Sequence, residues 1–156
     1  MSAGADGKAG QNPAKSRMEG IPHCRELGLE VVEMTRERCL VRLPYRPQFV
    51  GNPESGILAG GIITTVIDSV CGMAVQVALQ KVLTIATLDL RIDYLRPATP
   101  GADLLASAEC YKLTRQIAFV RGIAHDGDPD DPVAHCVATF MIGTPGLAAR
   151  QPEESQ

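Results

Sequence analysis

The chain has 156 residues and a mass of 16.6 kDa, which is the size of a single domain with its own core. Apolar residues make up 45% of it and charged residues 21%, a balance that excludes a wholly disordered protein. The net charge of −3 argues against nucleic-acid binding through a basic surface, because neutralising phosphates requires an excess of lysine and arginine.

The cysteines and the terminal segments indicate the cellular compartment in which the protein is expected. The five cysteines are odd in number, widely spaced, and form no Cys-x-x-Cys pair, which argues against a disulfide framework or a metal site. Residues 1–16 are small, polar and Gly-rich, without the basic and apolar segments of a secretory signal. We therefore expect a cytoplasmic protein with reduced thiols, and flexible tails at 1–16 and 145–156 around one domain at 17–144.

The residue pattern in the first part of the domain predicts two strands and a loop. Residues Leu27–Met34 and Arg38–Leu43 are short β-like runs joined by polar residues. Gln48–Gly56 contains an Asn-Pro pair and two glycines, which is typical of a loop.

Ile57–Gln80 is an unusually apolar segment of 24 residues with one charged side chain, Asp68. Its length would suit a transmembrane helix. A mid-segment carboxylate opposes that interpretation, since it costs roughly 2.5–3.5 kcal/mol on the insertion scale. Interspersed hydroxyl and glycine residues also oppose it. The segment therefore predicts a helix buried on most sides inside a soluble fold.

After this helix the pattern changes to a period of two. Leu88, Leu90 and Ile92 alternate with charged residues, which predicts a half-buried strand starting near Thr84. Residues 102–113, 116–125 and 133–143 are three more strand candidates, and the connections indicate an antiparallel meander. The predicted fold class is α+β, with an antiparallel sheet wrapped around one long central helix.

Two features of the helix could carry chemistry. Asp68 is expensive to bury, and perturbed carboxylates concentrate at active sites, although structural ones held by backbone or hydroxyl groups are common. Gly60 and Gly61 would expose backbone N–H groups at the positive end of the helix dipole, as in an oxyanion hole. The alternative for the glycines is a tight turn or close packing, and the pair alone does not decide between them.

Geometry links these two features. Gly60 and Asp68 are eight residues apart, so they lie ~12 Å apart along one helix. A carbonyl oxygen on the Gly60 N–H cannot bring its carbon within reach of the same chain's Asp68. If both groups serve one reaction, they must come from two subunits with antiparallel helices.

The segments Leu58-Ala59-Gly60-Gly61, Ile67-Asp68 and 87–98 (TLDLRIDYLRPA) together resemble the PaaI-type acyl-CoA thioesterases of the hotdog-fold superfamily. The resemblance covers roughly residues 27–143. It implies a sheet around one central helix, a homodimer or homotetramer with a continuous intersubunit sheet, and hydrolysis of an acyl-CoA substrate. It implies no metal and no cofactor, since the CoA belongs to the substrate, and no membrane partner.

The resemblance also implies roles for individual residues. By position, Asp68 matches the helix carboxylate that acts as base or nucleophile, and Gly60 matches the glycine whose N–H polarises the thioester carbonyl. Thr87 matches a strand hydroxyl that orients water, and Asn52 matches a loop amide before the glycines. Gly61, Lys112 and Arg115 are the candidates for binding the CoA part, since its phosphates require cations at the mouth of the site. For Lys112, Arg115 and also Arg121, the alternative is a solvated surface charge without a role in binding.

One position departs from the family pattern. The family usually reads His-Gly-Gly, whereas this chain reads Ala59-Gly60-Gly61. If the histidine only supports the loop, its loss lowers activity. If it is essential, the chain is a non-catalytic acyl-CoA-binding protein. The presence of Asp68 and Thr87 favours retained activity. A hotdog dehydratase is disfavoured, because the histidine-bearing motif expected of it is absent.

Overall fold

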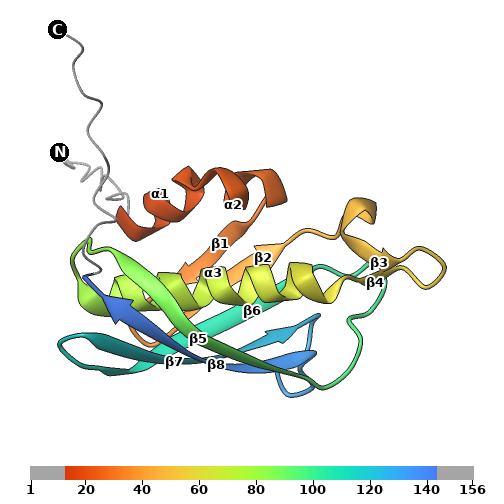
Figure 1. Ribbon diagram of the computed structural model, residues 1–156. Helices are drawn as coiled ribbons and strands as arrows, with labels where there is room; N and C mark the ends of the chain where they lie inside the picture. Colours follow the sequence, from red (N-terminus) through yellow and green to blue (C-terminus); the bar gives the residue numbers. More distant parts are fainter. Residues whose placement is uncertain (1–12, 144–156) are drawn as a thin grey trace, which may run out of the picture.

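The computed structural model describes residues 13–143, and Figure 1 labels their elements. In chain order they are α1 (Pro13–Gly20), α2 (Pro22–Leu27), β1 (Glu30–Met34), β2 (Cys39–Leu43), a 3₁₀ turn (Pro47–Phe49), β3 (Val50–Asn52), β4 (Ile57–Leu58), α3 (Gly60–Leu79), β5 (Ile85–Tyr94), β6 (Leu104–Leu113), β7 (Ile117–His125) and β8 (Ala134–Ile142).

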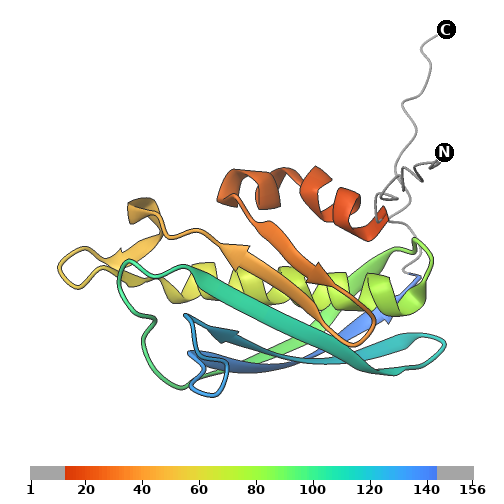
Figure 2. The same cartoon turned by 180° about the vertical axis from the view of Figure 1, so that it is seen from behind.

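Six strands form one antiparallel sheet in the order β1-β2-β6-β7-β8-β5, and the sheet curls around α3 (Figures 1 and 2). This confirms the fold class, the central helix and the six predicted strands, although the first strand begins at Glu30 rather than at Leu27, which ends α2, and the helix begins at Gly60 rather than at Ile57. The predicted simple meander is wrong in one respect: of the four strands after α3, only β6, β7 and β8 pair in chain order. β5 pairs with β8, and β2 lies beside β6. The connection at residues 95–103 is long enough to carry the chain across, whereas β6 and β7 are joined by a tight turn.

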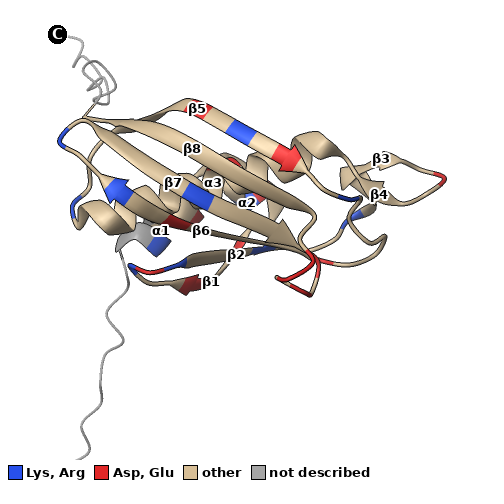
Figure 3. Ribbon diagram, turned by 90° about the horizontal axis from the view of Figure 1, so that it is seen from below, with Lys and Arg blue, Asp and Glu red and all other residues tan. Residues whose placement is uncertain are grey.

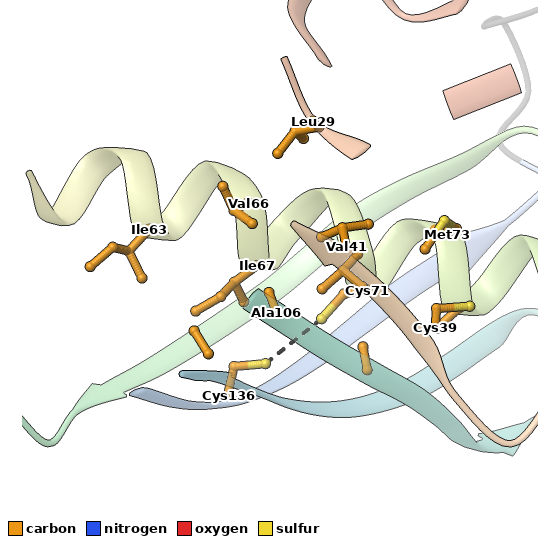
Figure 4. Close-up of a cluster of buried hydrophobic side chains, with 14 of the residues drawn as sticks. Leu29, Cys39, Val41, Ile63, Val66, Ile67, Cys71, Met73, Ala106 and Cys136 are labelled. Atoms are coloured by element: carbon orange, nitrogen blue, oxygen red, sulfur yellow. Dashed lines mark hydrogen bonds between the residues drawn. The ribbon is translucent and has the colours of Figure 1, made fainter. Parts of the chain in front are cut away.

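The core lies between α3 and the inner face of the sheet. Figure 4 shows Ile63, Ile67 and Cys71 of α3 pointing toward β6 and the other strands. Small inward side chains on the strands let the sheet approach the helix closely. At Gly122 of β7 even a methyl group is excluded, because a Cβ would lie 2.5 Å from the carbonyl oxygen of Ser107. Close approach over one continuous face accounts for the apolar composition of α3.

The apolar length of α3 would also suit a bilayer. It is long and apolar enough to cross a membrane by length and composition alone. In this fold it packs against β2, β5, β6, β7 and β8. That is the arrangement expected of a core helix, as the sequence predicted.

The N-terminal helices α1 and α2 were not predicted. α1 begins at Pro13, inside the segment expected to be a tail, because Met18 of α1 and Cys24 of α2 are buried and fix both helices on the domain. Such short helices carry little periodicity of their own, so tertiary packing decides them. Residues 1–12 and 144–156 of the predicted tails lie outside the described part.

The predicted loop at 48–56 is more ordered than expected. It contains the 3₁₀ turn and β3, which pairs with β4 in a small hairpin just before α3 (Figure 1). Gly51 permits this approach, because a Cβ there would lie 3.0 Å from the Cα of Ala59. The hairpin thereby supports the residue that precedes the helix.

Arg96 joins two connections at one end of the sheet. Its guanidinium donates two hydrogen bonds to the Asp126 carboxylate, at 2.9 and 2.7 Å, and the Thr99 N–H donates a third at 2.7 Å. The Asp126 side chain is only 6% exposed. The bonds from Arg96, followed by that from Thr99, hold the pKa of Asp126 well below its usual range despite burial. Asp126 thus ties the β5–β6 connection to the β7–β8 connection.

We predict that Asp126→Asn lowers the free energy of unfolding by about 2 kcal/mol, because charge-assisted hydrogen bonds are lost in a nearly dry site. Denaturant unfolding measures this. Asp131→Asn is the control, since Asp131 also contacts Arg96 but its side chain is 70% exposed. Equal losses in the two variants would contradict the assignment.

The depressed pKa of Asp126 also makes the free energy of unfolding depend on pH. Because the folded-state pKa is depressed, the stabilisation is fully present above the unfolded pKa of about 3.9 and is lost as the pH falls below it. We expect wild-type unfolding free energy to drop on acidification through that range, and the drop to be smaller in Asp126→Asn. Identical acid profiles would contradict this.

Candidate active site

Asp68 and Thr87 meet at the seam between α3 and β5. Asp68 is half-buried on α3, and the Thr87 hydroxyl donates a hydrogen bond of 3.0 Å to Asp68 Oδ1. The bond satisfies one carboxylate oxygen and fixes the orientation of the group. The sequence singled out both residues, and the structure brings them together within one chain.

A β-bulge places Thr87 on the correct face. On β5, Thr87 is opposite Phe140 while Asp89 is opposite Thr139, so Leu88 is the extra residue. Uninterrupted alternation would turn Thr87 away from the helix and Leu88 toward it. The bulge reverses this: Thr87 faces Asp68, and Leu88 is 52% exposed. Bulges that re-aim a side chain are common beside active sites.

A cavity of about 470 Å³ begins at this pair, within the size range of small-molecule sites. It is lined by the C-terminal half of α3, by α1 and α2, and by the start of β5. Apolar side chains make up most of its lining surface, and polar side chains lie among them at His23, Gln76 and Thr84 as well as near Asp68. The residues are Met18, Ile21, His23, Cys24, Asp68, Ser69, Gly72, Met73, Gln76, Thr84, Ile85, Thr87 and Phe140.

The two glycines open α3, as predicted. Ala59 is the N-cap and provides no side-chain hydrogen bond. The N–H groups of Ile62 and Ile63 bond to the Ala59 carbonyl, so those of Gly60 and Gly61 precede the intrahelical ladder. Gly60 is exposed. This end of the helix can therefore offer N–H donors, aided by the helix dipole, to a developing negative charge.

Tyr94 is a residue near this end that the sequence did not single out. Its hydroxyl, at the end of β5, donates a 2.8 Å hydrogen bond to the Gly60 carbonyl and lies 2.8 Å from the Thr64 hydroxyl. These contacts attach the first turn of α3 to the sheet. The only sequence signal was its place in the family-like segment at 87–98.

Within one chain, the two halves of the site stay apart. Gly60 is not among the residues of the cavity that contains Asp68, and both belong to the same continuous helix. Eight residues of helix separate them by ~12 Å. One chain therefore presents an acid with a cavity and, separately, a set of N–H donors.

The other predicted site residues lie outside the cavity. The Asn52 amide oxygen accepts the Glu54 N–H at 3.0 Å, which forms the turn of the β3–β4 hairpin. Lys112 is the second-last residue of β6, and Arg115 lies in the β6–β7 turn. This turn is at the end of the sheet where α3 ends rather than where it begins (Figure 1). Their predicted roles remain predictions.

A charged patch, a reactive cysteine or a metal site among the described residues could act as a second functional site. On the outer face of the sheet in Figure 3, basic residues are interspersed with acidic ones rather than gathered in one patch. Cys71 Sγ lies 3.7 Å from Cys136 Sγ, and contact with that thiol together with burial raises the pKa of Cys71 well above its usual value. A protonated, buried thiol is a poor nucleophile. Among residues 13–143, no three potential ligand side chains gather as a metal site.

Comparisons with known proteins agree with this geometry. The sequence model of the thioesterase superfamily matches residues 55–133. The medium/long-chain acyl-CoA thioesterase YigI of Escherichia coli is 27% identical over 136 residues, covering 79% of this chain and 86% of YigI.

Solved structures show the same fold. A Pseudomonas aeruginosa protein superimposes with a TM-score of 0.75 at 43% identity, covering 82% of this chain and 95% of that one. Thioesterase superfamily member 2 of Mus musculus has a TM-score of 0.68 at 22% identity, with coverages of 82% and 93%, a likeness of fold alone. The chain therefore belongs to the thioesterase superfamily, a family of thioester hydrolases, and its sheet around one helix is the hotdog fold.

Proposed function

We propose that this protein hydrolyses acyl-CoA thioesters to the free acid and CoA, with Asp68 as the acid–base group. The observation that carries the proposal is Asp68 itself, oriented by Thr87 at the wall of a mainly apolar cavity. A carboxylate held beside apolar space suits an acyl group with its reacting carbon near the acid. The acyl-CoA activity of the relative YigI supports this substrate class.

The active site is shared between two chains. β5 is an edge strand of the sheet, and its exposed side chains include Leu88 and Tyr94. Pairing of two such edges about a two-fold axis would remove both edges and set the α3 helices antiparallel. Gly60 of one subunit would then approach the partner subunit's Asp68. This arrangement resolves the separation of the two groups within one chain.

The reaction follows from the two groups. Water forms a bond to the carbonyl carbon, and its proton passes to Asp68. The Gly60 N–H of the other subunit stabilises the oxyanion that forms. The intermediate collapses, the C–S bond breaks, and the CoA thiolate takes the proton back from Asp68. Because Thr87 occupies Oδ1, the Oδ2 atom is the one directed to water.

The remaining assignments are part of the same proposal. Asn52 lies before the helix and supports its entry, while Gly61, Lys112 and Arg115 bind the CoA part. A water nucleophile and a carboxylate base require no metal or cofactor. Five free cysteines suit a cytoplasmic location, since reducing conditions keep thiols unpaired.

Ala59 supports a second candidate function, a binding protein with slow or no turnover. A methyl group there leaves the thioester carbonyl without the imidazole usual in the family. The measurement that separates the candidates is release of free thiol from octanoyl-CoA, beside its binding by calorimetry. Binding without thiol release would favour the second function.

We predict that Asp68→Asn lowers kcat by a hundredfold or more, an effect of about the size general bases supply. The amide keeps the acceptor for Thr87 but cannot take a proton, so KM should change little. Thiol release from octanoyl-CoA measures it. Asp89→Asn, an exposed change on β5, is the control. Equal thiol release by wild type and Asp68→Asn would overturn the assignment.

A mixing experiment tests the shared site. Gly60→Pro removes the N–H at a first helical position where proline is tolerated, and Ala59 already has the extended conformation (φ −64°, ψ 136°) that a following proline requires. Gly60→Pro and Asp68→Asn should each be nearly inactive.

When Gly60→Pro and Asp68→Asn are mixed, unfolded and refolded together, the sample should recover about a quarter of wild-type activity. Half of the dimers then contain one chain of each variant, and each such dimer has one intact site of two. Mixing without unfolding is the control for exchange. No recovery despite formation of mixed dimers would contradict a shared site.

A further inference from the structure

Gly72 lies in the interior of α3, one turn after Asp68 and on the same face. It belongs to the cavity lining. A Cβ at this position would lie 3.7 Å from Ile85 Cδ1 and 3.8 Å from Phe140 Cε1, which are ordinary van der Waals distances. The structure therefore has room for a methyl group at this position, and a larger side chain would extend into the space between α3, Ile85 and Phe140.

No packing or backbone requirement explains this glycine. Its φ is not among the positive values of the described glycines. Gly122 gives the contrast, because a Cβ there would collide with the Ser107 carbonyl oxygen at 2.5 Å. Alanine is the better helix former, so Gly72 weakens the helix without relieving a clash.

The space beside Gly72 suits an aliphatic chain. Ser69 and Gln76 donate their hydrogen bonds to backbone carbonyls, at 2.8 Å each, so these two polar side chains of the lining are already satisfied. Met18 of α1 and Met73 of α3 also line the cavity, and methionine side chains adapt to apolar ligands.

The lining residues on α3 indicate how an acyl chain would lie in the cavity. Its lining includes Asp68, Gly72 and Gln76, which follow one another at one-turn intervals along one face of α3, together with residues of α1 and α2. An acyl group whose carbonyl carbon lies near Asp68 would extend along this face, away from the start of α3. The first turn after Asp68 is thus the point at which added bulk would block a long chain first.

We propose that Gly72 is a specificity-determining residue, and that its missing side chain admits an unbranched aliphatic acyl chain into the cavity of the subunit that supplies Asp68. This rests on the proposed function, which it deepens. Short acyl groups end before Gly72 and do not depend on it. Longer chains pass beside Ile85 and Phe140 and do.

The test compares Gly72→Ala and Gly72→Leu with wild type on acetyl-, octanoyl- and palmitoyl-CoA. Gly72→Leu should lower kcat/KM for the two longer substrates by about tenfold or more, and for acetyl-CoA by less than about twofold. Gly72→Ala should raise Tm and shift the preference in the same direction by a smaller factor. Ala78→Leu adds similar bulk on α3 outside the cavity lining and should leave the profile unchanged.

A second measurement separates this inference from the proposed function. Calorimetry with S-octyl-CoA, a thioether that cannot be hydrolysed, reports occupancy of the cavity without turnover. Weaker binding in Gly72→Leu, but not in Ala78→Leu, would support the inference even if wild type released no thiol. An unchanged chain-length profile and unchanged binding in folded Gly72→Leu would overturn it, whereas thiol release by wild type would still support the proposed function.

Discussion

The rest of the structure depends on the packing of one apolar helix against the concave face of a sheet. α3 must be apolar to be buried there, so its single carboxylate has few possible partners. One threonine hydroxyl from β5 supplies the contact, and the β-bulge at Leu88 brings that hydroxyl to the helix. A rigid helix also keeps Asp68 ~12 Å from the N–H groups at its start. The shared site that we propose is a consequence of that separation.

Stability and function make opposite demands on the same helix. Filling the space at Gly72 with alanine would favour helix formation by roughly 0.5–1 kcal/mol and would clash with nothing nearby. In the specificity that we propose, the missing side chain at this position is what admits an acyl chain beside Asp68. The glycine at position 122, by contrast, is required for the close approach of β7 to the neighbouring strands β6 and β8. The two residues show that a buried glycine has to be interpreted from its neighbours.

Several elements could not be predicted because their stabilisation is not local. α1 and α2 are short and depend on burying Met18 and Cys24. The β3–β4 hairpin depends on the close approach of Gly51 to Ala59. The sequence did not single out Arg96, although it bonds to Asp126, thirty positions away in the chain. Tyr94 contacts the carbonyl of Gly60 across a similar separation. Residue patterns carry little information about such pairs.

The sequence by itself determined the central helix, the six strands of the main sheet and the acid within the helix, because the periodicity of apolar side chains is a property of short segments. It also identified Thr87, through a family resemblance, but regular alternation would have turned that side chain outward. The tertiary structure decided the position of β5 beside β8, the bulge that aims Thr87 at Asp68, and the cavity under α1 and α2. These features arise where segments distant in the chain come into contact, and only the packed fold sets those contacts.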